Sequence, residues 1–131
     1  TNRSPLIRIP VTRGEGTRVE LRCPDSAANP YLTLAVCLQA GLDGIRNQIE
    51  PPAAVTENVF EMRMSQKNKL GIEELPADLG EALAEFEKDE YLQNVLGRHA
   101  TEKYIEAKKS EWADYRAQVS DWEINNYLYK I

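Results

Sequence analysis

The chain has 131 residues, the size of one domain, and its 42% hydrophobic and 28% charged residues are close to the averages for a globular protein. Its net charge of −5 argues against non-specific binding to nucleic acid or to an anionic membrane surface, which needs a basic excess. The longest apolar run, residues 32–38, contains Thr33 and is far shorter than the roughly 20 residues of a membrane span. No signal peptide is evident.

Two short strands are predicted at the start of the chain, over residues 5–11 and 17–23. The loop "VTRGEGT" joins them and contains two glycines that favour a turn. In the second strand, charged residues alternate with apolar ones: Arg18, Glu20 and Arg22 with Val19, Leu21 and Cys23. We therefore expect one charged face, shared with Arg8 of the first strand, and one apolar face that looks into the core.

A helix is predicted from Pro30 to about Arg46. Asn29 is suited to cap it, and Pro30 suits the first helical position. Because this helix is apolar on nearly every side, we expect it to be buried, with close packing as the reason for Gly41 and Gly44.

The stretch 48–76 reads as a long irregular loop, punctuated by "EPPAAV" and "LPAD". Loops of that length are usually functional or lie over other subunits. Asp78 and Glu81 then form a capping box ahead of a helix, and a further helical turn or two ends near Gly97. Thr101 is predicted to cap a long helix to about Val119.

The last part of the chain carries a stripe of mainly aromatic residues at helical spacing: Ile105, Trp112, Tyr115, Val119 and Trp122. This spacing fits a helix packed on its own core, and it also fits packing against another subunit. The tail "YLYKI" favours contact with another subunit, because exposed aromatic residues at a terminus are a liability. The tail, residues 120–131, is predicted as a short helix.

These elements predict an α+β fold, with a short antiparallel strand pair followed by a mainly helical section. We divide the chain into a hairpin, residues 1–25, and a helical part, residues 26–131.

The chain opens on "TNRSPLIRIP" without an initiator methionine and enters a charged strand almost at once. We therefore expect it to be a piece of a longer polypeptide. Cys23 and Cys37 are too few for a disulfide framework, so we expect reduced core thiols and a cytoplasmic location.

The charged strand face is the candidate site. Same-face residues on a strand lie about 6.8 Å apart, so Glu20 has a guanidinium on each side, from Arg18 and Arg22. Carboxylate oxygens suit Mg²⁺ or Mn²⁺, and arginine suits phosphate and carboxylate groups. This pattern favours a site for a metal-bound polyphosphate beside a carboxylate substrate, with Arg3 and Arg8 contributing. The alternative is a solvated face of ordinary ion pairs, which contribute little to stability.

Three sequence blocks decide between these readings. "NRSPLIRIP", "RVELRCPDSAANPYL" and "AGLDGI", over residues 2–47, closely resemble the C-terminal part of the catalytic domain of type I glutamine synthetase, and "WEINNYLYKI" resembles the C-terminus of that family. The resemblance spans essentially the whole chain. Because the family's enzyme is several times longer, the resemblance implies that most of the catalytic barrel and the other metal ligands lie outside this sequence. We therefore expect the isolated chain to be inactive.

The resemblance implies a role for each charged residue. Arg3 matches an arginine between nucleotide phosphate and glutamate, and Arg8 matches an ATP-phosphate arginine; both are candidate catalytic residues. Glu20 matches a ligand of a divalent metal, Mg²⁺ or Mn²⁺. Arg22 matches the arginine that holds the glutamate carboxylate, and Arg18 resembles a nucleotide-side arginine.

Two positions depart from the family pattern. The loop "VTRGEGT" is one residue shorter than in the enterobacterial pattern, so the lysine that contacts ATP there has no secure counterpart, and Glu15 or Gly16 falls near its place. Phe60 stands where adenylylated members carry tyrosine, and it has no hydroxyl to accept a nucleotidyl group. The resemblance therefore places the chain with members controlled by feedback inhibition and, in some, by transcription regulators.

The resemblance implies a ligase that makes glutamine from glutamate, ATP and ammonia, and that assembles as two stacked rings of six subunits. The alternative function is a regulatory or assembly module, in which the arginines merely form ion pairs and the chain serves protein–protein contact. His99 and Asp43 are expected to have structural roles near helix ends.

Overall fold

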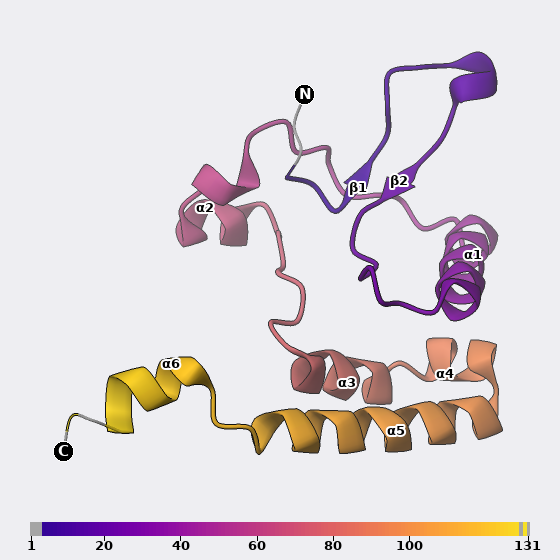
Figure 1. The fold of residues 1–131 in the computed structure, drawn as a ribbon. Coiled ribbons are helices and arrows are strands. Elements are labelled where there is room, and N and C mark those ends of the chain that lie inside the picture. Colours follow the sequence, from indigo (N-terminus) through magenta and orange to yellow (C-terminus); the bar gives the residue numbers. More distant parts are fainter. Residues whose placement is uncertain (1–3, 129, 131) are drawn as a thin grey trace. The chain divides into compact units, whose positions relative to one another are not determined.

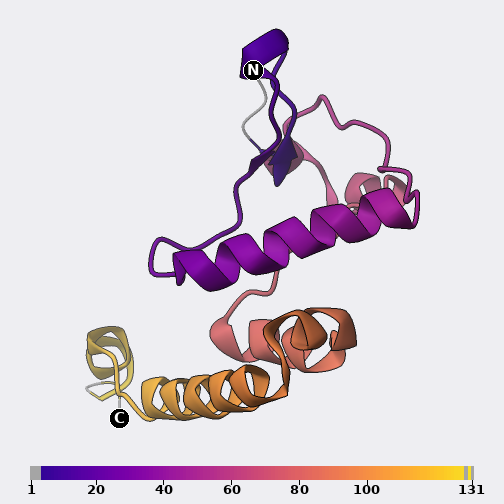
Figure 2. The same cartoon turned by 90° about the vertical axis from the view of Figure 1, so that its right-hand side faces the viewer.

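A computed structural model describes residues 4–128 and residue 130. The chain divides into two compact units, residues 1–74 and residues 75–131, which we describe separately (Figures 1 and 2). The first unit contains the strand pair and helices α1 and α2, and the second unit is helical. The α+β fold predicted from the sequence is confirmed.

The strand pair is antiparallel, as predicted, but short. Strand β1 (Ile7–Arg8) pairs with β2 (Glu20–Leu21) in a register that places Arg8 opposite Glu20. One further backbone hydrogen bond, from Arg22 N to Leu6 O at 3.0 Å, extends the pairing. Proline flanks the first strand at both ends, and a residue without an N–H cannot continue a strand ladder. The intervening loop contains the 3₁₀ turn η1 (Gly14–Gly16), where Gly14 has a φ of +72°.

The apolar face of the hairpin differs from the prediction. Val19, Leu21 and Cys23 are all exposed in the structure rather than directed into a core. The prediction was wrong because the two strands form a sheet of their own, and neither of its faces is covered where these residues lie. Cys23 and Cys37 are both free thiols, as predicted, but neither lies in a core, since Cys23 is exposed and Cys37 is half-buried.

Helix α1 (Pro30–Arg46) has the predicted bounds. The side chain of Asn29 caps it by accepting hydrogen bonds from Tyr31 N at 3.0 Å and Leu32 N at 3.3 Å. The expected burial of α1 is wrong for this chain, since none of its residues is buried. A Cβ atom at Gly41 or Gly44 would meet open space, so close packing does not explain these glycines here.

The stretch 48–76 is less irregular than the sequence suggested. It contains the 3₁₀ turn η2 (Val59–Glu61) and the short helix α2 (Met64–Lys69). Gln66 stabilises the start of α2, because its Oε1 atom accepts a hydrogen bond from Arg63 N at 3.0 Å. An ion pair of 2.6 Å between Lys67 Nζ and Glu74 Oε1 ties α2 to the segment that follows it.

The second unit begins with three consecutive helices: α3 (Leu79–Lys88), α4 (Glu90–Leu96) and α5 (Arg98–Arg116). Figures 1 and 2 both show α3 and α4 lying along α5. Asp78 Oδ1 accepts the Glu81 N–H, as predicted, whereas Glu81 Oε2 reaches back to Ala77 N rather than to Asp78 N.

The start of α5 differs from the prediction. The helix begins at Arg98, directly after Gly97, whose φ of +79° lets the chain turn between α4 and α5. Thr101 therefore lies inside the helix and does not cap it. Its side chain is buried, and its hydroxyl donates a hydrogen bond of 2.9 Å to Gln93 O of α4.

Helix α3 packs against α5, and Leu83 of α3 is buried, with 6% of its surface exposed. The indole of Trp112 lies so close to Gly80 that a Cβ atom there would stand 2.5 Å from Nε1. Phe86 of α3 and Tyr104 of α5 meet edge to face, with ring centroids 5.8 Å apart.

The C-terminal segment is helical, as predicted. Helix α6 (Asp121–Glu123) begins with a capping box between Ser120 and Glu123 and continues as the π-helical turn η3 (Ile124–Leu128). The aromatic stripe does not run along one helix, because α5 ends at Arg116. Ile105 and Trp112 are half-buried, whereas the other members of the stripe are exposed: Tyr115, Val119 and Trp122.

No helix in the described part of the chain combines the length and the apolar character that crossing a membrane requires.

Candidate functional site

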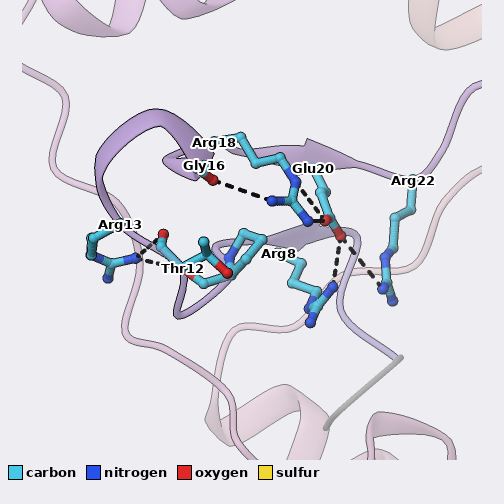
Figure 3. Close-up of polar contacts among 8 residues, drawn as sticks. Arg8, Thr12, Arg13, Gly16, Arg18, Glu20 and Arg22 are labelled. Atoms are coloured by element: carbon cyan, nitrogen blue, oxygen red, sulfur yellow. Dashed lines mark hydrogen bonds and ion pairs between the residues drawn. The ribbon is translucent and has the colours of Figure 1, made fainter.

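The candidate site is built around the carboxylate of Glu20, on the charged face of the hairpin (Figure 3). The strand register places Arg8 directly opposite, and Arg8 Nη1 contacts Glu20 Oε2 at 2.9 Å. The side chains of Arg8 and Glu20 are only 32% and 25% exposed. A contact between residues twelve positions apart in the sequence thus depends on the antiparallel pairing.

Two more arginines approach the same carboxylate from its own strand. Arg18 donates to Glu20 Oε1 through Nε at 3.0 Å and through Nη2 at 2.8 Å, so both of its hydrogen bonds end on the same carboxylate oxygen. Arg22 Nη2 lies 3.9 Å from Glu20 Oε2. Figure 3 shows the three guanidinium groups gathered around one end of Glu20.

The charge balance of this cluster is positive, because three guanidinium groups surround a single carboxylate. Hydrogen bonds from Arg8 and then Arg18 lower the pKa of Glu20 below its ordinary value of 4.5, because they favour the ionised form. The cluster therefore holds a fixed negative charge within a group of cations that suits phosphate and carboxylate groups.

The structure brings together four of the predicted site residues: Arg8, Arg18, Glu20 and Arg22. Arg13, another arginine of this basic segment, instead donates to the carbonyl oxygens of Pro10 at 2.6 Å and Thr12 at 3.1 Å. The prediction for Arg3 lies outside the described residues.

The cluster offers one candidate metal ligand. Oxygen of a carboxylate is the donor that Mg²⁺ and Mn²⁺ prefer, and Glu20 supplies it. Among residues 4–128 and 130, no group of three or more His, Cys, Asp or Glu side chains is placed to hold a metal ion. Within the described cluster, Glu20 is thus the one side chain with the chemistry of a Mg²⁺ or Mn²⁺ ligand, and it does not form a complete metal site by itself.

Other predicted residues lie apart from the cluster. His99 is exposed in the first turn of α5. Asp43 accepts a hydrogen bond of 2.8 Å from Asn47 Nδ2 at the end of α1, a contact typical of a structural role. Phe60 is 83% exposed in η2.

One contact near the site was not predicted from the sequence. Ser4 Oγ accepts a hydrogen bond of 3.0 Å from Val59 N, which joins the start of the hairpin to η2. The only signal in the sequence was a serine before a proline, a pattern too common to indicate a partner 55 residues away.

Comparison with known proteins gives consistent results along the chain. Residues 1–127 match the family described as "Glutamine synthetase, catalytic domain". The chain is 51% identical over 129 residues to glutamine synthetase of Clostridium saccharobutylicum and 50% identical over 127 residues to that of Methanocaldococcus jannaschii. These matches cover 98% and 97% of this chain but only 29% and 28% of the relatives.

Solved structures agree with the sequence relatives. A structure of GmaS in complex with ADP matches with a TM-score of 0.82 and 38% sequence identity, over 97% of this chain and 27% of that one. A structure of GmaS without ligand matches with a TM-score of 0.79 and the same identity. The chain thus corresponds to a little over a quarter of the proteins it resembles.

Proposed function

Because the chain belongs to the glutamine synthetase catalytic-domain family, we propose that it is the C-terminal part of an ATP-dependent ligase that makes glutamine from glutamate and ammonia. The observation that carries this proposal is the 51% identity to a glutamine synthetase over nearly the whole chain. The gathering of Arg8, Arg18 and Arg22 around Glu20 supports it, since the reaction handles phosphate and carboxylate groups together.

The proposed reaction has two steps. The γ-phosphoryl group of ATP is transferred to the γ-carboxylate of glutamate, which releases ADP and forms γ-glutamyl phosphate. The nitrogen of ammonia then attacks the acyl carbon, the carbon–oxygen bond to phosphate breaks, and inorganic phosphate and a proton leave as the amide forms. Both steps move charge on phosphoryl oxygens, and cationic groups fixed nearby stabilise that charge.

Each residue of the cluster has a proposed part in this reaction. Arg8 and Arg18 bind the nucleotide phosphates, and Arg22 binds the carboxylate of glutamate. Arg3 lies between phosphate and glutamate. Glu20 would hold a Mg²⁺ or Mn²⁺ ion as one of its ligands, and the ion would supply further positive charge near the phosphates; the remaining ligands would come from outside this chain. The GmaS structure with ADP supports the nucleotide part, because it shares the fold of this chain.

The proposed setting is a cytoplasmic enzyme of twelve subunits in two stacked rings of six. The exposed aromatic residues of the C-terminal segment support a contact with another subunit. Regulation through feedback inhibitors, and through transcription regulators in some members, fits a phenylalanine at position 60, which has no hydroxyl to modify.

Replacing Glu20 with glutamine in the full-length enzyme tests the proposal. We expect glutamine synthesis to fall sharply and Mg²⁺ binding to weaken by at least about tenfold, since loss of even an outer-sphere partner costs about 10- to 100-fold. Glu50→Gln removes an exposed carboxylate elsewhere and serves as the control. The 131-residue chain alone should make no glutamine in the same assay.

Unchanged Mg²⁺ affinity and unchanged synthesis in Glu20→Gln would contradict the metal role. Such a result would favour an assembly module in which these residues form ion pairs only.

A further inference from the structure

The start of the hairpin is tied to a distant turn of the same unit. Ser4 Oγ accepts the Val59 N–H at 3.0 Å, and the contact is partly buried. The first described residues therefore run beside the segment that leads into α2 (Figure 1). The contact has one effect on η2 and another on the strand pair.

On one side, Ser4 completes the hydrogen bonding of η2. The first N–H groups of a helical turn have no partner within the turn. Asn58 accepts two of them, from Phe60 N through Oδ1 at 3.2 Å and from Glu61 N through its carbonyl oxygen at 3.1 Å. Ser4 accepts the remaining one, from Val59. The start of η2 is thus held by the adjacent residue Asn58 and by Ser4 of the hairpin.

On the other side, the link between Ser4 and the arginine cluster is short and stiff. Pro5 fixes its own φ and restricts Ser4 before it to an extended backbone. Leu6 O then accepts the Arg22 N–H at 3.0 Å, and Arg8 lies two residues further on. The position of Ser4 therefore sets the backbone that carries Arg8 and the partner strand at Arg22.

We infer that Ser4 is a positioning residue, which holds η2 against the hairpin and thereby sets the placement of Arg22 for the carboxylate of the substrate. This inference rests on the proposed function.

A double-mutant cycle in the full-length enzyme tests the inference. Ser4→Ala removes the acceptor, and Val59→Pro removes the donor at a position where proline suits the first residue of a helical turn. Each should raise the KM for glutamate about 2- to 12-fold, the factor that corresponds to one neutral hydrogen bond. The double variant should be no worse than either single variant, because both changes remove the same bond. Ser4→Thr keeps the hydroxyl and should restore the KM.

Ser65→Ala, which removes an exposed hydroxyl on α2, is the control and should leave the KM unchanged. An unchanged KM in either single variant, additive effects in the double variant, or failure of threonine to rescue would overturn the inference.

Amide hydrogen exchange provides a readout that does not require activity. Ser4→Ala should speed exchange at Val59 and Arg22, and unchanged exchange at both would overturn the inference. If the wild-type enzyme makes no glutamine, the proposed function fails, while the exchange measurement still decides the role of Ser4.

Discussion

The two carboxylate oxygens of Glu20 accept hydrogen bonds from two different arginines. Oε1 accepts from Arg18 and Oε2 accepts from Arg8, with Arg22 close by. A carboxylate has about four lone-pair positions, so these contacts leave room for a metal ion only on the side away from the guanidinium groups. In the proposed metal site, an ion held by Glu20 would lie beside cations, and phosphate groups bound by the arginines would offset that repulsion.

The lowered pKa of Glu20 gives a prediction for pH dependence. In the folded chain the pKa of Glu20 lies below its ordinary value of 4.5. The stabilisation from the Arg8 and Arg18 contacts is therefore fully present above pH 4.5 and is lost as the pH falls through the folded pKa. A ¹³C carboxyl titration should show a midpoint below 4.5 for Glu20, and Arg8→Gln should move it upward. Arg13→Gln is the control, because Arg13 bonds to backbone carbonyls instead. A midpoint that does not respond to Arg8→Gln would contradict the assignment.

Among the elements, the helices of the second unit depend on one close approach. Trp112 of α5 lies against Gly80 of α3, and Leu83 of α3 is buried. Lys109 and Glu87 form an ion pair of 2.5 Å that links α5 to α3 at the surface. Surface pairs of this kind contribute about 0–1 kcal/mol, so the apolar contact governs the packing.

Gly80→Ala should destabilise the second unit. A Cβ atom would stand 2.5 Å from Trp112 Nε1 and 2.7 Å from Cε2, so the indole has to move. Overpacking costs about 1–3 kcal/mol, and over most of this range the cost exceeds the gain of about 1 kcal/mol in helix propensity. Gly41→Ala in α1 meets open space and should keep that gain. Thermal denaturation of the chain measures the stability of both variants. Equal stabilisation by the two alanines would show that the indole of Trp112 moves aside without a loss of stability.

The sequence predicted those elements whose signals are local. The start of helix α1 is set by Asn29 and Pro30, adjacent residues whose effects on a helix start are independent of the rest of the fold. Thr101 has the same capping chemistry, but its hydroxyl bonds to Gln93 of another helix, and Gly97 supplies the turn. Helix α2 was missed because its six residues are mostly polar and carry no apolar periodicity.

The candidate site was also predictable only where the signal in the sequence is local. Alternation on a strand put Arg18, Glu20 and Arg22 on one face, and antiparallel pairing added Arg8. Ser4 was not predictable, because its partner Val59 is brought to it only by the course of the chain after α1. Burial of α1 was mispredicted for a related reason: burial depends on what covers a helix, and composition does not specify that.

At the scale of the molecule, both units expose apolar side chains. The C-terminal segment carries Trp122 and Tyr127, whose rings meet edge to face with centroids 5.5 Å apart, and Trp122 is 62% exposed. An ordered aromatic pair at a surface is suited to contact with another protein, because its apolar area is large and its conformation is already set.

Deleting residues 121–131 from the full-length enzyme should lower its oligomeric mass. The deletion removes the aromatic pair together with the capping box at Ser120 and Glu123. Size-exclusion chromatography with light scattering measures the mass. Trp122→Ala is the smaller change and should weaken assembly in the same direction. A truncated enzyme of unaltered mass would count against a subunit contact in this segment.

The distribution of indole rings has a practical consequence. The chain has two tryptophans, Trp112 and Trp122, and both belong to the second unit. Trp112 is half-buried and stacks on Tyr115 with centroids 5.6 Å apart, whereas Trp122 faces solvent. Loss of the α3–α5 contact should therefore shift the fluorescence emission of Trp112 to the red. The emission of Trp122 is already red-shifted and provides the reference. The arginine hairpin contributes no tryptophan emission, so an indole introduced there would report on it alone.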